Sequence, residues 1–173
     1  MNVSLVMTII GPDRPGLVDS VASLVAAQGG NWLESRMAHL GGHFAGILRV
    51  EAPAEREAEL TAALQGLQSA GLTVVVHRGQ PIAVATESLM ALELVGQDRP
   101  GIVRQISHAL ASHGVNVEEF TSECVSAAMS GEVLFKAQIT VKVPQACDLA
   151  HLRQDLEKIA ADLIVDLAFQ KVG

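Results

Sequence analysis

The chain has 173 residues, of which 49% are hydrophobic and 18% are charged, and its formal net charge is −7. This composition is typical of a globular protein and excludes an intrinsically disordered chain. The 12 lysines and arginines occur singly, so the clustered positive surface that binds a phosphate backbone is missing, and we expect no direct binding to nucleic acid.

The first part of the chain predicts alternating strands and helices. Residues 3–10 are rich in aliphatic and β-branched side chains, which indicates a strand. Apolar side chains from Leu17 to Val25 follow helical spacing, which predicts a helix over 15–28 with Pro15 in its first turn. The further expected elements are strands over 31–40 and 43–51 joined at Gly41-Gly42, a helix from Pro53 to Gly71, and a strand over 72–77.

The second part repeats this order. Its expected elements are a strand over 88–96, a helix over 100–113, strands over 116–126 and 132–143 joined at Ser130-Gly131, a helix over 147–161 and a strand over 163–170. The order β-α-β-β-α-β is typical of the ferredoxin-like arrangement. We therefore expect an α+β fold with two ferredoxin-like domains, each a four-stranded antiparallel sheet with two helices on one face. The domains are predicted over 1–79 and 88–173, with a linker over 80–87.

The repeat extends to individual residues. Residues 11–18 read Gly-Pro-Asp-Arg-Pro-Gly-Leu-Val, and residues 96–103 read Gly-Gln-Asp-Arg-Pro-Gly-Ile-Val. Without a gap, nine of 21 positions are identical between 11–31 and 96–116, and both stretches end on asparagine. The chain therefore contains two copies of one fold, and we expect both glycine turns to have the same function.

The chemistry of the turn favours an amino-acid ligand. Backbone N–H groups at a helix start attract a carboxylate, and Gly16 and Gly101 would let a ligand approach the backbone. We expect the strand order to bring Asn31 and Asn116 near these turns, where a carboxamide offers donors and an acceptor. The carboxylates of Asp13 and Asp98 would attract the ammonium group of a zwitterion.

The same residues fit three other interpretations. Asp13 and Asp98 would suit helix N-caps. Arg14 with Asn31, and Arg99 with Asn116, superficially resemble the arginine and asparagine of an acylphosphatase-like hydrolase. We expect no catalysis, because the proline of each turn deletes an N–H donor and the aspartate would repel a phosphate. A purely structural adaptor with empty pockets is the third alternative.

The motifs also carry a family resemblance. Asp-Arg-Pro-Gly-[Leu/Ile]-Val after a first strand, followed by Gly-x-Asn at the second, resembles the ACT domain, a regulatory module that binds amino acids. Two such domains in one chain resemble the glycine cleavage system transcriptional repressor family. The further stretches that support this resemblance are 34–41, 43–47 and 129–135.

The resemblance implies a regulator without an enzymatic activity, a cofactor or a DNA-binding motif. Members of that family are cytoplasmic and restrain a LysR-type activator, with glycine as the proposed signal; an ACT-type sensor of another amino acid is the nearest alternative. ACT effectors sit between neighbouring domains, held by the first turn of one and a strand of the other. The candidate ligand-binding residues are Asp13, Gly16, Leu17, Asn31, Asp98, Gly101, Ile102 and Asn116.

The two predicted pockets differ in their surroundings. Gly30 and Trp32 have Val115 and Val117 as their counterparts in the second repeat. This difference suggests pockets of unequal size and polarity, of which one alone would bind ligand.

No metal site is expected from the sequence. His39 and His43 flank a hairpin without a third ligand, and His108 and His113 are expected on the surface near a helix end. The two cysteines, Cys124 and Cys147, have no zinc or redox spacing, which indicates a reduced, cytoplasmic setting. The sequence begins without a basic, signal-peptide-like region, and no apolar run is long enough to span a membrane.

Overall fold

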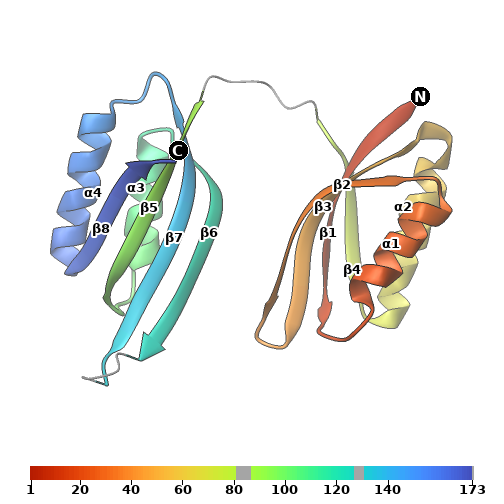
Figure 1. Cartoon of the computed structure of the whole chain (residues 1–173), viewed down its shortest axis with the longest axis horizontal. Helices are drawn as coiled ribbons and strands as arrows, with labels where there is room; N and C mark the ends of the chain where they lie inside the picture. The colour runs from red at the N-terminus through yellow and green to blue at the C-terminus, as the bar shows by residue number, and fades with distance from the viewer. Residues whose placement is uncertain (81–86, 127–130, 173) are drawn as a thin grey trace. The chain divides into compact units, whose positions relative to one another are not determined.

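A computed structural model describes residues 1–80, 87–126 and 131–172 of the chain (Figure 1). The chain divides into two compact units, Met1–Ile82 and Ala83–Gly173. Most of the predicted linker, residues 81–86, and the predicted turn residue Ser130 lie outside the described residues. No helix in the described part is both long and apolar enough to cross a membrane.

The first unit is a four-stranded antiparallel sheet with the strand order β2-β3-β1-β4. Its helices α1 and α2 lie on one face of this sheet (Figure 1). The elements are β1 (Asn2–Pro12), α1 (Leu17–Ala27), β2 (Asn31–Leu40), β3 (His43–Pro53), η1 (Ala54–Arg56), α2 (Glu57–Gly66), η2 (Leu67–Ala70) and β4 (Thr73–Arg78).

The second unit repeats this topology, with the strand order β6-β7-β5-β8 and the helices α3 and α4 on one face (Figure 1). Its elements are β5 (Glu87–Gln97), α3 (Ile102–Ser112), β6 (Asn116–Ser126), β7 (Val133–Pro144), α4 (Leu149–Leu163) and β8 (Val165–Lys171). The predicted α+β class with two ferredoxin-like domains is therefore confirmed.

Each unit has its own apolar core between the sheet and the helices. Alternate residues of the central strands point toward the helices, because side chains along a strand alternate between its two faces. In the first unit, the fully buried strand residues Leu5 and Met7 meet the helical residues Val21, Leu60 and Leu64. The second core is formed in the same way, and no polar or charged residue is buried among the described residues.

The helices after the two glycine turns begin later than the sequence predicted. Pro15 and Pro100 precede the helices, which start at Leu17 and Ile102. Asp13 and Asp98 are not their N-caps either. The N-cap residues are Gly16, with φ 89°, and Gly101, with φ 98°. This left-handed conformation costs other residues free energy, so both turns depend on glycine.

The second helix of the first unit also differs from its prediction. Strand β3 continues to Pro53, a 3₁₀ turn follows over Ala54–Arg56, and the α-helical part is limited to Glu57–Gly66. In the second unit, Asp148 caps α4 through its carboxylate, which accepts hydrogen bonds from the N–H groups of Ala150 and His151 at 3.0 and 3.1 Å. An acidic N-cap stabilises a helix because it satisfies N–H groups that lack helical partners.

Candidate functional site

The first glycine turn borders a shallow hollow of about 250 Å³ at the N-terminus of α1. A Cβ atom added to Gly16 would meet nothing within 4 Å, so the backbone of the turn is open to a ligand. The residues that line the hollow are Asp13, Arg14, Gly16, Leu17, Val18, Asp19 and Phe44. The hollow combines the unpaired N–H groups of a helix start with two carboxylates, which suits the two ends of a zwitterion.

The chain around this turn is held at both sides. The N–H of Asp13 donates to the carbonyl of Gly42 in the β2-β3 hairpin at 3.0 Å. Its carboxylate lies 3.6 Å from Nε2 of His39. The guanidinium of Arg14 donates to the carbonyl of Ala70 at the end of η2. These contacts fix the turn between the hairpin and the second helix without occupying Gly16.

The second glycine turn has the same backbone conformation as the first, but the charged side chains around it differ. The N–H of Asp98 donates to the carbonyl of Val133 at 2.9 Å, and a Cβ on Gly101 would approach only Nε2 of Gln105, at 3.9 Å. Asp19 in the first turn of α1 has Arg104 as its counterpart on α3. The second turn therefore offers one acidic group fewer to a ligand ammonium.

Leu17 and Ile102 can contribute to these turns only through their backbones. Their side chains are 5% and 2% exposed, respectively, and pack in the two cores. The predicted contact is thus limited to their N–H groups. Four residues that line the first hollow were not predicted as ligand-binding: Arg14, which was considered only for a hydrolase, and Val18, Asp19 and Phe44. The hairpin register could have indicated Phe44, which pairs with Gly11 directly before the turn.

The expectation that Asn31 and Asn116 lie near the turn of their own unit is wrong. Asn31 is paired with Glu51, which is paired with Ser4 near the start of β1. The turn follows Pro12 at the other end of that strand. Eight residues of extended chain span about 26 Å. The charged groups of a free amino acid lie only about 3 Å apart, so the turn and the asparagine of one unit cannot hold the same ligand.

The second unit has the same separation. Asn116 is paired with Lys142, which is paired with Leu89, whereas the turn follows Gln97. The physical reason is that helix α1 or α3 returns the chain to the starting end of the sheet before the next strand begins. Because of this separation, Arg14 with Asn31 and Arg99 with Asn116 form no hydrolase-like pair within a unit.

The two asparagines have different surroundings. Nδ2 of Asn116 donates to Oε1 of Glu118 at 2.9 Å, and Oε2 of Glu118 lies 2.8 Å from the ammonium of Lys142. Lys142, together with Asn116, holds the pKa of the Glu118 carboxyl below its ordinary value. Asn31 is exposed and lies beside Glu51, whose carboxylate accepts a hydrogen bond from Asn2 at 3.5 Å. The amide of Asn116 is thus engaged within its own unit.

The differences at Gly30 and Trp32 lie at the asparagine end of the sheet. A Cβ on Gly30 would come within 2.9 Å of a methyl group of Val25, so its role is the close approach of α1 to the sheet. Its counterpart Val115 is buried in the second core. Trp32 is half-buried against the first core, and Val117 is 38% exposed. The units therefore differ at the end that carries the asparagines.

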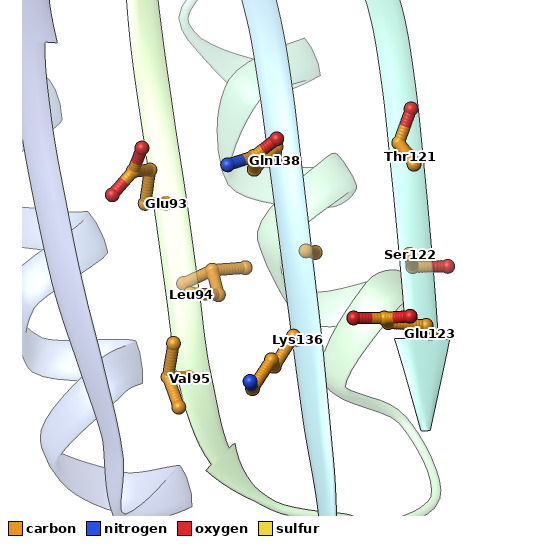
Figure 2. Close-up of a pocket in the computed structure, with 9 residues that line it drawn as sticks. Glu93, Leu94, Val95, Thr121, Ser122, Glu123, Lys136 and Gln138 are labelled. Carbon is orange, nitrogen blue, oxygen red and sulfur yellow. The ribbon is translucent and has the colours of Figure 1, made fainter. Parts of the chain in front are cut away.

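A second hollow, of about 200 Å³, lies on the second sheet between β5, β7 and β6 (Figure 2). Figure 2 shows Lys136 on β7 and Glu123 on β6 at one end of it, and Gln138 and Thr121 at the other. The hollow holds none of the residues of the repeated turns. We therefore do not assign the amino-acid site to it.

The sequence of the chain is similar to those of known proteins. The ACT-domain family model matches residues 4–77 and again residues 88–170. The glycine cleavage system transcriptional repressor of Escherichia coli (strain K12) is 26% identical over 161 residues, which cover 92% of this chain and 85% of that protein. The protein of the same name from Shigella flexneri matches equally well.

Solved structures agree with the fold. A protein from Galdieria sulphuraria has a TM-score of 0.90 and 26% identity, with 100% of both chains covered. A structure named as a candidate glycine cleavage system transcriptional repressor has a TM-score of 0.73 and 20% identity, and covers 99% of this chain and 98% of its own. Because its identity is only 20%, this second structure supports the fold alone.

Proposed function

Because the chain belongs to the ACT-domain family, we propose that it is a regulatory protein that senses a small amino acid and passes the signal to a protein partner. Its similarity to the glycine cleavage system repressors makes glycine the first effector to test and a LysR-type transcription factor the first partner to test. The dispersed positive charge supports action through that partner rather than direct binding to DNA. We also propose a cytoplasmic setting, which the family resemblance implies.

The observation that carries the proposal is the pair of open glycine turns. Each places a glycine with positive φ at the start of a helix, and each leaves space where a side chain would stand. The N–H groups of such a turn would bind the ligand carboxylate. Asp13 or Asp98 would attract the ammonium group. Each turn is one half of an effector site.

The asparagines supply the other half from a different ACT domain. Asn31 and Asn116 lie at the far end of their own sheets, about 26 Å from the turns. A small ligand can contact a turn and an asparagine together only if the asparagine comes from another ACT domain, such as one at a junction with a second copy of the chain. We propose that the effector binds at such a junction.

A site of this kind explains regulation. A ligand that contacts two domains stabilises the arrangement in which both contacts are made, and it shifts the population toward that arrangement. The coupling free energy available to a small effector is about 1–3 kcal/mol. The partner would distinguish the two arrangements by its affinity for each.

The experiment that tests the proposal is a thermal-shift panel of the 20 amino acids on the full chain. A ligand that binds only the folded state raises the melting temperature, so we expect glycine or another small amino acid to do so at millimolar concentration. If none of the 20 changes the melting temperature, the sensing function is contradicted. Co-purification of the native host's LysR-type regulator with and without that amino acid then tests the partner.

A further inference from the structure

A group of three metal-ligating side chains lies away from the proposed effector site, where α3 meets α4. His113 directly follows α3, and His151 and Asp155 stand one turn apart on α4. Their ligand atoms all lie within 4.8 Å of one another. We propose that this group, the α3–α4 triad, is a binding site for a divalent transition-metal ion such as Zn²⁺.

The core fixes the positions of these side chains. Leu152 and Leu156, which follow His151 and Asp155 in the sequence, are fully buried against the second sheet. Residues four apart on a helix lie on the same face, so both α4 ligands point the same way. At the end of α3, Leu110 is buried in the same core. The triad is therefore presented by two packed helices.

The distances suit a metal ion after small side-chain movements. Nε2 of His113 lies 2.8 Å from Oδ2 of Asp155, and Nε2 of His151 lies 3.8 Å from the same oxygen. Ligand atoms about 2.0–2.1 Å from a tetrahedral Zn²⁺ ion are about 3.3 Å apart. The observed separations lie on both sides of this value. A bound ion would therefore widen the separation between His113 and Asp155 by about 0.5 Å and draw in the exposed side chain of His151.

The donor set selects the class of metal. Two imidazoles and one carboxylate suit Zn²⁺, Co²⁺, Ni²⁺ or Cu²⁺, whereas Mg²⁺ and Ca²⁺ prefer oxygen ligands alone. Three protein ligands leave a fourth position for water. The His113 side chain is 13% exposed and that of His151 is 63% exposed, so the triad is closed on the α3 side and accessible on the other.

The first unit shows that the fold itself does not require these side chains. Its buried pair Leu60 and Leu64 corresponds to Leu152 and Leu156. The residues at the positions of His113, His151 and Asp155 are then Gln28, Glu59 and Ala63. The sequence did not indicate the triad, because it predicted His113 on the surface. The side chain of His113 is instead only 13% exposed and forms a hydrogen bond with Asp155.

Protons compete with the metal for these ligands. The hydrogen bond from His113 holds the pKa of the Asp155 carboxyl below its ordinary value, so this carboxylate is ionised at neutral pH. Metal binding needs both imidazoles in their neutral form. Lys158 also acts on Asp155, and its positive charge opposes the metal.

The test uses the full chain without an affinity tag and with Cys124 and Cys147 both changed to serine, so that thiolates cannot bind the metal. Co²⁺ titration should give a visible d–d absorption band with one ion per chain, and Zn²⁺ should raise the melting temperature and displace the Co²⁺. His151→Ala and Asp155→Asn should each weaken Co²⁺ binding at least about tenfold. His108→Ala, which changes an exposed histidine on α3, should leave the affinity unchanged.

Two results would overturn the proposal. One is the absence of a Co²⁺ band at millimolar metal and pH 7.5, with no rise in melting temperature on addition of Zn²⁺. The other is an affinity that is the same in His151→Ala as in the parent protein. Because His151 is exposed, its loss should leave the fold intact, and far-ultraviolet circular dichroism checks this directly.

Discussion

The effect of a single residue is clearest at the glycine turns. Gly16 occupies a left-handed conformation with open space around it, so a side chain there would be strained by its backbone and not by a clash. The N-cap residues of α1 and α3 are Gly16 and Gly101, and not Asp13 and Asp98 as the sequence suggested. The same φ that makes the turn open to ligand therefore makes it intolerant of substitution.

We expect Gly16→Ala to lower the free energy of unfolding of the first unit by about 1–2 kcal/mol. Gly66→Ala is the matched control, because Gly66 has right-handed helical φ and equally open space. That change should raise stability by about 0.5–1 kcal/mol. Urea unfolding followed by the fluorescence of Trp32, the single tryptophan of the chain, reports on this unit. Equal effects of the two substitutions would contradict the account of the turn.

The ion pair of Glu118 and Lys142 gives a pH dependence with a definite sign. The pKa of the Glu118 carboxyl is lowered in the folded protein. Its contribution to stability is therefore present above the unfolded pKa of about 4.5, and it is lost as the pH falls through the lowered folded value. Glu118→Ala should lose less stability than the parent between pH 7 and pH 3. The exposed neighbour Glu119 provides the control, and urea midpoints at the two pH values measure the difference.

At the scale of elements, the sequence predicted most of the fold. Helical spacing from Leu17 to Val25 predicted that α1 exists, and the glycine pair at residues 41–42 placed the first hairpin correctly. The helix starts were misplaced because Pro15 fits a first helical turn as well as the turn before it. The distance from the turns to Asn31 could not be read from motif spacing, because it depends on strand register and on the return path of α1.

The residue that ends α4 has a strained backbone conformation. Ile164 is the one non-glycine residue with positive φ among the described residues, at 57°, and it is 68% exposed. The first unit has Gly71 where its second helix ends. Because β-branched residues are disfavoured in this conformation, Ile164→Gly should raise the free energy of unfolding by about 0.5–1 kcal/mol.

The converse substitution, Gly71→Ile, should destabilise the first unit by a larger amount, since it adds strain and removes nothing unfavourable. Denaturation followed by circular dichroism for Ile164→Gly, and by Trp32 fluorescence for Gly71→Ile, gives both values. A loss of stability in Ile164→Gly would show that the contacts of this side chain outweigh its backbone strain.

At the scale of the whole molecule, the sheets have four edge strands, β2, β4, β6 and β8. An exposed edge offers unpaired N–H and C=O groups, which native proteins cover or pair. We therefore predict a homodimer. Light scattering at tens of micromolar should give a mass near twice the chain mass of 18.2 kDa. A single-chain mass would contradict this prediction and leave the metal site unaffected.

The central claim is that one effector site takes a glycine turn from one ACT domain and an asparagine from another. The most direct measurement is calorimetric titration of the stabilising amino acid into the parent protein, Gly16→Ala, Gly101→Ala, Asn31→Ala, Asn116→Ala and the four turn–asparagine double variants. Asn2→Ala serves as the control for the amides. The account predicts at least one turn and one asparagine whose single changes weaken binding about tenfold or more and whose double change is non-additive. Unchanged affinity in both Asn31→Ala and Asn116→Ala would contradict it.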